Sequence, residues 1–297
     1  YERRRAHDCR ATKVENDMTR SGFVTLVGRP NVGKSSLLNA MCGRKVSIVS
    51  DKPQTTRRQV RGVVNRGDGQ IVFVDTPGLH KPVTALGERV NSAALDSLSD
   101  VDIVCLVIDA TQPVGSGDSW VASRLDVSKA VVVLNKIDAV SRDVIVQQLA
   151  KLAELDAESY FPVSARTSEG VPALVDHLVS RLPEGPLYYP EDVISDLSET
   201  DWIAELVREE LLGIMRDELP YSIATRVVDV EGDRVVCEIL VERESQKGMV
   251  VGRSGSILKR VRQKVRPQLP AGTKLELKVK VDKDWQRRPD RIERLGY

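Results

Sequence analysis

The strongest constraint on the fold is the segment 28–35, which reads GRPNVGKS and follows a short apolar run at residues 23–27. The spacing Gly-x-x-x-x-Gly-Lys-Ser is typical of a loop that joins a buried strand to a helix and binds phosphate. Its glycines let the backbone curl, so that successive N–H groups face phosphate oxygens. The helix expected over 35–41 adds the positive end of its dipole. The candidate phosphate-binding residues are Gly28, Arg29, Pro30, Asn31, Val32, Gly33, Lys34 and Ser35.

Two side chains of this loop have predicted roles in chemistry. Lys34 is expected to reach the β- and γ-phosphates of a nucleotide, and the Ser35 hydroxyl to bind Mg²⁺. The same pattern also occurs by chance in unrelated loops. The interpretation therefore depends on the strand before the loop and the helix after it.

Further apolar runs at 71–74, 101–108 and 130–134 each lead into a polar loop and a helix-compatible stretch. Continuous apolar strands that alternate with helices indicate a mostly parallel sheet with both faces covered. We therefore predict an α/β fold with a doubly wound sheet. Such a sheet binds its ligand at the carboxyl ends of its strands.

A second motif, DTPG at 75–78, follows the run 71–74. Asp75 is placed to hold Mg²⁺ through a water molecule. The Gly78 N–H can approach the γ-phosphate because no Cβ blocks it. Taken alone, the tetrapeptide is an ordinary turn. The residues predicted to line the nucleotide here are Asp75, Thr76, Pro77, Gly78 and Leu79.

A third motif, NKID at 135–138, predicts that the base is guanine. Guanine presents two adjacent donors, N1–H and N2–H₂, and the Asp138 carboxylate can accept from both. Adenine would leave that carboxylate unpaired. Asn135 is expected to brace neighbouring loops and the Lys136 stem to lie over the base, with Ile137 between Lys136 and Asp138. A fourth segment, which is weak evidence alone, contributes Ser164, Ala165 and Arg166 through backbone N–H groups.

Between the first two motifs lies PQTTRR at 53–58. A threonine in a mobile loop here could bind Mg²⁺ only when the γ-phosphate is present, which would make an order–disorder switch. Thr56 is the first choice and Thr55 the second, and a plain polar loop is the alternative. The predicted catalytic set is Lys34, Thr56, Asp75 and Gly78, of which Thr56 and Asp75 join Ser35 at the metal.

The pattern changes after residue 183, where Pro and acidic residues become frequent. We predict an N-terminal extension at 1–20, a nucleotide-binding domain at 21–183, a linker at 184–200 and a second domain at 201–297. Met18 could be the natural start. In the second domain we expect a helix over 201–219 ended by Pro220, strands over 223–230, 234–241 and 273–281, and a helix over 254–266.

The second domain carries a Gly-x-x-Gly loop directly before a helix, as KH domains do where they clamp a nucleic-acid backbone. From residue 247 onward the chain has 15 Lys and Arg against 5 Asp and Glu, which suggests an anionic partner. An accidental turn and a solvated charged surface are the alternatives. The candidate RNA-binding residues are Lys247, Gly252, Arg253, Ser254, Gly255, Lys259, Arg262 and Arg266.

Composition excludes several classes of protein. The four cysteines are far apart and form no CxxC pair, so a zinc site is not expected. No apolar run reaches the ~18 residues of a membrane span. The N-terminus lacks the apolar stretch of a secretory signal, so we expect a cytoplasmic protein.

Together these segments resemble the Era family of bacterial GTPases over roughly residues 21–297. The resemblance rests on GRPNVGKS, PQTTRR, DTPGLH, NKID, GPLYYPED, RDELPYS, ERESQKGMVVGRSG and KVKVDKDW. It implies a type II KH fold, binding to the 3′ end of 16S rRNA, a role in maturation of the 30S subunit and peripheral association with the inner membrane. Arg253 and Ser254 depart from the Lys and Gly that are commoner in the family, and Ser36 stands where Thr is commoner.

The expected reaction is hydrolysis of GTP to GDP and phosphate by in-line attack of water. Leu79 follows the second motif in place of a glutamine that could orient the water, and His80 is expected to be a bystander. The resemblance implies that Asn31 ligates K⁺. A GTP-dependent switch, an RNA-binding assembly factor with structural GTP, and a tRNA-modifying GTPase remain alternatives. The lack of a C-terminal Cys motif disfavours the last, and a monomer is expected.

Overall fold

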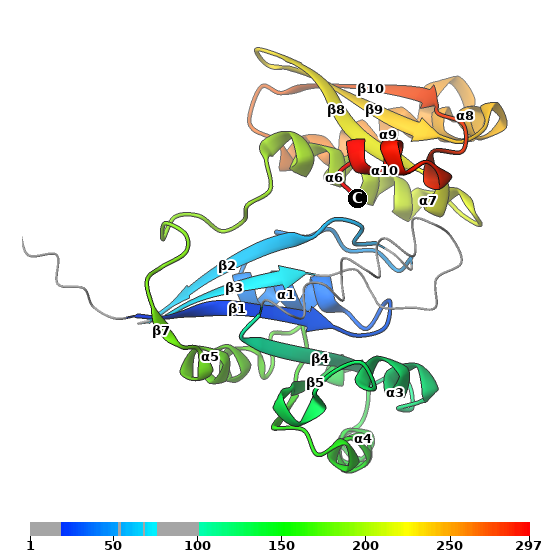
Figure 1. The fold of residues 1–297 in the computed structure, drawn as a ribbon. Coiled ribbons are helices and arrows are strands. Elements are labelled where there is room, and N and C mark those ends of the chain that lie inside the picture. The colour runs from blue at the N-terminus through cyan, green and yellow to red at the C-terminus, as the bar shows by residue number, and fades with distance from the viewer. Residues whose placement is uncertain (1–18, 53–54, 68, 76–100) are drawn as a thin grey trace, which may run out of the picture.

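The computed structural model describes residues 19–52, 55–67, 69–75 and 101–297, and these contain two β-sheets (Figure 1). The larger sheet has the strand order β2-β3-β1-β4-β5-β6, with β7 paired to β1. The smaller sheet has the order β10-β9-β8. In Figure 1 the smaller sheet lies above the larger one. No helix in the described ranges is both long and apolar enough to cross a membrane.

The larger sheet is mostly parallel, which confirms the prediction. β1 runs parallel to both of its long neighbours, β3 and β4, while β5 and β6 continue in the same direction. β2 ends the sheet and is antiparallel to β3. The strands are β1 (Thr19–Val27), β2 (Val60–Arg66), β3 (Gly69–Asp75), β4 (Ile103–Asp109), β5 (Val131–Asn135) and β6 (Ser159–Pro162).

Helices cover both faces of this sheet, since successive strand residues point to opposite sides. Val131 and Val133 of β5 join a core with α1 (Lys34–Cys42) and α5 (Val171–Arg181). Val132 and Leu134 join the opposite core with α3 (Ser116–Ala122) and α4 (Arg142–Leu152). Buried strands therefore hold the loops at their carboxyl ends in fixed positions.

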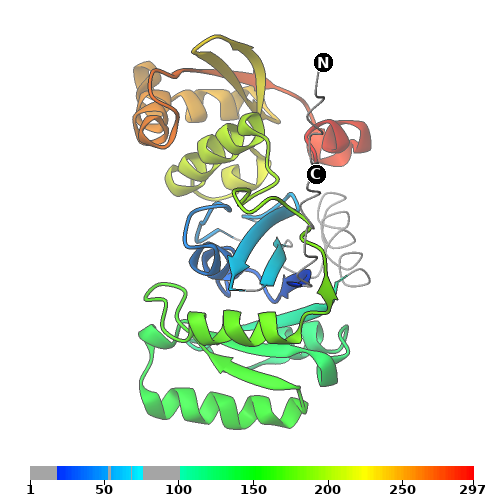
Figure 2. The ribbon, with the colours of Figure 1, turned by 90° about the vertical axis from the view of Figure 1, so that its left-hand side faces the viewer.

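The segment 184–200, predicted as a linker, lies against the larger sheet (Figure 2). Its first residues form β7 (Glu184–Gly185), which is antiparallel to β1. Further along, the Gln70 side chain accepts from the Tyr188 and Tyr189 N–H groups at 2.8 and 3.0 Å. The Val63 N–H donates to the Ile194 carbonyl at 2.8 Å. These contacts constrain the path by which the chain reaches the smaller sheet.

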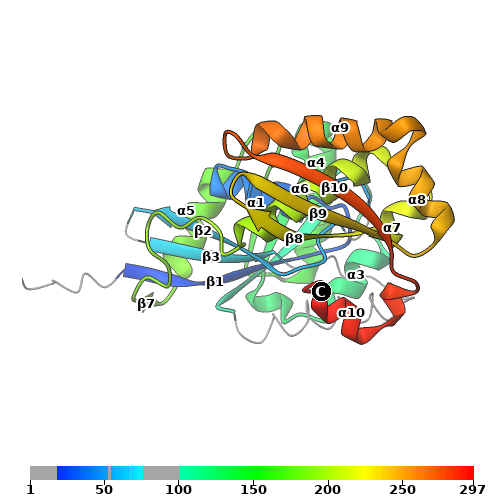
Figure 3. The same ribbon diagram turned by 90° about the horizontal axis from the view of Figure 1, so that it is seen from above.

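The smaller sheet joins β8 (Ala224–Glu231), β9 (Arg234–Val241) and β10 (Lys274–Val281). β9 is antiparallel to β8 and parallel to β10. Figure 3 shows α8 and α9 beside this sheet, and α6 shares its core. The helices are α6 (Glu199–Ile214), α7 (Leu219–Ser222), α8 (Glu244–Val251) and α9 (Ser256–Val265).

One predicted boundary in this part of the chain is wrong, and one helix was not predicted. The helix expected to reach residue 219 ends at Ile214, because Met215 is extended and Asp217 has a φ of 56°. Pro220 does not end it; it occupies the first turn of α7, where its missing N–H costs nothing. Helix α8 was not predicted, because Gly248 interrupts the helical pattern of residues 244–251.

The last sixteen residues form a compact segment that the sequence pattern did not reveal. It contains a 3₁₀ turn (Trp285–Arg287) and α10 (Pro289–Arg294). Fully buried Trp285, with Ile292 and Leu295, packs against Ala224 and Leu240 of the smaller sheet. In Figure 1, α10 and the C-terminus lie below that sheet, on the side of the larger one.

Candidate nucleotide-binding site

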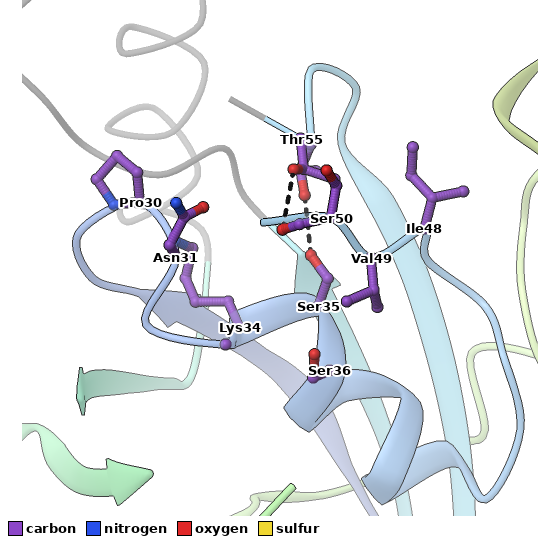
Figure 4. A pocket seen from close by; sticks show the side chains of 11 residues that line it. Pro30, Asn31, Lys34, Ser35, Ser36, Ile48, Val49, Ser50 and Thr55 are labelled. Atoms are coloured by element: carbon purple, nitrogen blue, oxygen red, sulfur yellow. Dashed lines mark hydrogen bonds between the residues drawn. The ribbon is translucent and has the colours of Figure 1, made fainter. Parts of the chain in front are cut away.

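The loop 28–33 has the curled backbone that its glycines predict. Asn31 and Gly33 have φ values of 65° and 96°. A Cβ at Gly33 would lie 2.4 Å from Asn135 Nδ2, so only glycine fits beside the third motif. Figure 4 shows the loop with Pro30, Asn31 and Lys34 around one pocket. The loop and the start of α1 thus form one concave surface.

Lys34 is held inside this loop. Its ammonium donates to the carbonyls of Gly28 and Arg29, each at 3.1 Å. Burial lowers the pKa of Lys34 to about 8, although the nearby Asp75 carboxylate opposes that effect. The two carbonyls are neutral acceptors, so a buried ammonium held by them is suited to bind the anionic phosphate oxygens of a ligand.

Four side-chain oxygens meet at the carboxyl end of β3. Asp75 Oδ2 accepts from Ser35 Oγ at 2.9 Å, from Ser47 Oγ at 2.8 Å and from Thr56 Oγ1 at 3.3 Å. The oxygens of Ser35 and Thr56 are 2.9 Å apart. Ser47 was not predicted, because nothing in its sequence context points to the site. The structure thus brings together the three predicted metal residues Ser35, Thr56 and Asp75.

This oxygen cluster fits a hard divalent cation. Asp75 is fully buried, and burial raises the pKa of its carboxyl group. Its Oδ1 has no hydrogen-bond partner among the residues that the structure describes. An unpaired buried carboxylate oxygen is costly, and a cation with oxygen ligands would satisfy it. The hydroxyl and carboxylate donors are those that Mg²⁺ prefers.

The structure distinguishes the two threonines of the segment 53–58. The Thr55 hydroxyl donates to the Lys52 carbonyl at 2.6 Å and faces Ser50 (Figure 4). Thr56 is the residue that reaches Ser35 and Asp75. The predicted residues Thr76, Pro77, Gly78 and Leu79, together with His80, lie outside the described residues.

A second cavity, of about 430 Å³, adjoins the phosphate loop beside the third motif. Ser164 Oγ donates to Asp138 Oδ1 at 2.7 Å and so orients the carboxylate that is expected to read the base. Asn135 Nδ2 donates to the Val32 carbonyl at 3.0 Å, while its Oδ1 accepts from the Ala165 N–H at 3.1 Å. The cavity is lined by Gly33, Ser36, Asn135, Lys136, Asp138, Ala139, Ala165 and Arg166.

Lys136 lies between the phosphate loop and β4. Its ammonium donates to the Asn31 carbonyl at 2.7 Å and to Asp109 Oδ2 at 2.6 Å. Asp109 was not predicted; the sequence offers no signal beyond its position at the end of β4. Its carboxylate holds the Lys136 stem along the cavity. Ile137 is buried behind this loop and packs in the core with α4.

The predicted RNA-binding loop lies between α8 and α9. Gly252 has a φ of 74°, and a Cβ there would lie 2.7 Å from Ile257 Cγ1. Ser254 adopts a φ of 52°, a left-handed conformation that glycine adopts most easily. Arg253 and Ser254 are exposed. The predicted residues Lys259, Arg262 and Arg266 are exposed on α9 and its end, as are Arg260 and Lys264. Lys247 of α8 pairs with Glu244.

Comparison with known proteins places both parts in one family. The family described as 50S ribosome-binding GTPase matches residues 23–136, and the KH domain family matches residues 218–286. The GTPase Era of Heliobacterium modesticaldum is 43% identical over 290 residues, which cover 94% of this chain and 97% of that protein. The GTPase Era of Mycobacterium tuberculosis is 45% identical over 296 residues, which cover 93% and 98%. The chain belongs to the Era family.

Solved structures of Era agree with this assignment. One is Era in complex with MgGDPNP and nucleotides 1506–1542 of 16S ribosomal RNA, with a TM-score of 0.89, 35% identity and coverage of 94% and 99% of the two chains. Another is a variant of Aquifex aeolicus Era bound to GDP and AlF₄⁻, with the same TM-score and 36% identity. The predicted fold, a doubly wound α/β GTPase domain followed by a type II KH domain, is confirmed. As an Era-family protein the chain is a GTPase.

Sequence reasoning missed the contacts of this Era-family chain that join residues 55–58, beside the nucleotide site, to the smaller domain. Arg57 and Arg58, directly after Thr56, contact α6, α7 and the C-terminal segment. Arg208 of α6 donates to the Thr55 carbonyl. The PQTTRR motif includes both arginines, but nothing local in the sequence identifies their partners, which lie more than 140 positions away.

Proposed function

We propose that the chain is a GTP-dependent switch that binds the 3′ region of 16S rRNA and assists maturation of the 30S subunit. One observation carries the proposal: both domains together match Era bound to a GTP analogue and to nucleotides 1506–1542 of 16S rRNA. The Gly-x-x-Gly loop of this chain supplies the corresponding chemistry. GTP hydrolysis would then alternate the protein between two states with different affinity for RNA.

The surface around the Gly-x-x-Gly loop supports RNA as the partner. The exposed Arg253 and the N-terminus of α9 offer positive charge to a phosphate backbone. Beside the loop lies a groove of about 330 Å³ whose wall includes Met249 and Ile257. Met249 is 58% exposed, and exposed apolar side chains next to cations suit unstacked bases.

The small subunit is the proposed site of action. The description of the matched GTPase family names the 50S subunit, but that match covers only residues 23–136. The match to the 16S rRNA complex covers 94% of the chain and includes the KH domain. RNA recognition belongs to the KH domain. The RNA named in the complex is therefore the proposed partner.

The proposed cofactors are GTP or GDP and Mg²⁺, held by residues of the site described above. Ser35 and Thr56 would bind the metal directly and Asp75 through water, with Gly78 toward the γ-phosphate. Bound Mg²⁺ supplies positive charge at the β- and γ-phosphates. Lys34 orients the same phosphates, and Asp138 selects guanine. The oriented phosphate is then positioned for in-line attack by water.

GTP-loaded protein should bind an RNA with the sequence of the 16S 3′ tail more tightly than a scrambled RNA, and Arg253→Gln should weaken that binding about tenfold. Loss of one phosphate contact should also reduce the slope of log K against log salt by about 0.7 for a single strand. Filter binding over a series of salt concentrations measures both. Arg142→Gln, on the exposed start of α4, is the matched control.

Equal affinity for the scrambled RNA would contradict the RNA assignment. So would an Arg253→Gln variant whose affinity for the 16S tail is unchanged. The same assay with GDP in place of GTP separates a switch from an assembly factor whose GTP is structural. A switch requires different RNA affinities in the two nucleotide states. The Asp75→Asn variant, with its metal contact weakened, should lose that difference.

We also propose that Asn31 ligates K⁺ and that this ion adds positive charge at the phosphates. Asn31 is exposed and its Nδ2 donates to the Asp51 carbonyl at 2.8 Å, which holds the side chain at the edge of the phosphate loop. Hydrolysis should be about tenfold faster in KCl than in NaCl of equal ionic strength. Asn31→Gly keeps the positive φ and should remove the difference. Equal rates in both salts in the parent protein would exclude this role.

The family resemblance further supports a monomeric cytoplasmic protein with peripheral association to the inner face of the cell membrane. The supporting feature of the chain is the excess of Lys and Arg after residue 247, which favours anionic surfaces. Sedimentation with vesicles of anionic and of neutral lipid tests the membrane contact, and gel filtration tests the monomer. Equal recovery with both lipids would contradict the proposal.

A further inference from the structure

The residues on both sides of Thr56 are held by residues 201–297, which we call the KH half of the molecule. Arg57 is 4% exposed and points away from the nucleotide site. Its guanidinium donates to the carbonyls of Ile223 at 2.6 Å, Tyr221 at 2.8 Å and Pro220 at 3.2 Å. These carbonyls lie at the end of α7, where helix carbonyls lack partners within the helix. Arg57 therefore completes the C-terminal end of a helix in the other domain.

Two aromatic rings of the C-terminal segment complete the pocket around Arg57. The guanidinium carbon is 5.8 Å from the centre of the Trp285 ring and 5.7 Å from that of Tyr297. Trp285 is itself anchored, because its Nε1 donates to the Ser222 carbonyl at 3.0 Å. A cation between two aromatic faces is stabilised by their quadrupoles. Residues 282–297, the last of the chain, thus serve as one wall of an arginine pocket.

Neighbouring contacts hold the rest of the segment. Arg58 forms an ion pair with Asp201 of α6 and donates to the Leu295 carbonyl. Arg208 is fully buried. Its Nε donates to Glu205 Oε1 at 3.0 Å, which orients the guanidinium, and the guanidinium also donates to the Thr55 carbonyl. Thr55, Arg57 and Arg58 are therefore all bound by the KH half, whereas Thr56 between them faces the metal oxygens.

The arginine pocket favours two discrete states over a gradual displacement. Arg57 is buried, and removing a guanidinium from water is costly. Three carbonyls and two rings offset this cost only when all are in place. A partly withdrawn Arg57 would leave its charge buried and would remove the donor to the Ile223 and Pro220 carbonyls, whereas the Tyr221 carbonyl would keep Gln286 Nε2 at 2.9 Å. The segment is therefore either docked, with Thr56 at the metal oxygens, or released as a unit.

We infer that Arg57 is a positioning residue: its docking between α7 and the C-terminal segment holds the Thr56 hydroxyl beside Ser35 and Asp75. The KH half would thereby support the metal-dependent, γ-phosphate-bound state of the GTPase site. The inference rests on the proposed role of Thr56 as a metal ligand. It adds a requirement that a GTPase domain alone would not meet.

Arg57→Met should raise the Mg²⁺ concentration for half-maximal GTP hydrolysis about tenfold and lower kcat by a similar factor, because the Thr56 oxygen is no longer held in place. Affinity for GDP should stay within about twofold, since this contact requires the γ-phosphate. Arg57→Lys, which keeps the charge but not the fork of donors, should recover only part of the loss. Arg61→Met is the matched control, because the Arg61 side chain is 41% exposed and its ion pair among the described residues is with Asp196.

Tyr297→Leu removes one wall of the pocket and changes no residue of the GTPase domain. It should shift the Mg²⁺ dependence in the same direction, by about threefold. Thr56→Ala is the reference for complete loss of the Thr56 hydroxyl.

If Thr56→Ala impairs hydrolysis while Arg57→Met and Tyr297→Leu keep the parent's Mg²⁺ dependence, the inference is wrong and the role of Thr56 stands. If Arg57→Met weakens GTP and GDP equally, Arg57 only stabilises the interface and the inference is wrong. If Thr56→Ala is itself unaffected, the metal assignment and this inference fail together.

Discussion

Asp138→Asn should lower the affinity for GTP by between about 10²- and 10⁴-fold while leaving the fold intact. The parent carboxylate can accept from N1–H and N2–H₂ of guanine at once, and Ser164 holds it for that purpose at 2.7 Å. Asparagine turns one of the two acceptors into a donor, which then faces a donor of the base. A buried donor without a partner costs the full desolvation penalty, so the loss is large.

The same variant should gain affinity for xanthosine triphosphate, whose base has a carbonyl in place of the 2-amino group. Competition against a fluorescent GTP analogue, with GTP, XTP and ATP as competitors, measures the exchange of specificity. Asp143→Asn, an identical change at an exposed position of α4, is the control. An Asp138→Asn variant that retains its affinity for GTP would contradict the assignment of this pocket to guanine. Equal competition by ATP and GTP in the parent would also contradict it.

The nucleotide site was largely predictable because each of its motifs is local. The loop 28–35 requires glycines and a lysine at fixed spacing, and each later motif directly follows an apolar strand. Once those strands are read as parallel, their carboxyl ends must meet at one edge of the sheet. The structure accordingly brings Lys34, Asp75 and Asn135 to that edge.

Residues whose partners are distant in sequence could not be found in this way. Ser47 and Asp109 join the site only because the fold brings them beside Asp75 and Lys136. The choice between two adjacent threonines depends on the path of the backbone through the segment. That path is fixed by Arg57 and its neighbours against carbonyls and rings of the KH half, a relation with no local signature.

The smaller domain shows the same limit in its secondary structure. The period of its first helix extends past Ile214, so pattern alone carries the helix to Pro220. Its last strand, by contrast, alternates cleanly between buried and exposed residues and was predicted within one residue at its start. The segment after Val281 is polar and rich in arginine, yet Trp285 is buried within it. Burial of a lone aromatic residue depends on partners that pattern does not specify.

Lys34→Met should reduce single-turnover GTP hydrolysis by about 10²- to 10³-fold, the loss expected when one preorganised donor is removed from a developing negative charge. The ammonium is already inside the loop, held by the Gly28 and Arg29 carbonyls at 3.1 Å, so little reorganisation is needed when phosphate binds. Methionine keeps the length and the apolar stem but offers no donor.

A stability measurement makes this test specific. Because burial lowers the pKa of Lys34 to about 8, the ammonium still predominates at pH 7 but is less favourable in the folded protein than in water, and an apolar side chain of similar length avoids that cost. The melting temperature of Lys34→Met should therefore not fall, whereas hydrolysis does. Lys129→Met, which removes an exposed lysine paired with Asp126, should change neither quantity. A variant that hydrolyses GTP at the parent's rate would show that phosphate is bound elsewhere, and one that loses activity and stability together would show that Lys34 is structural.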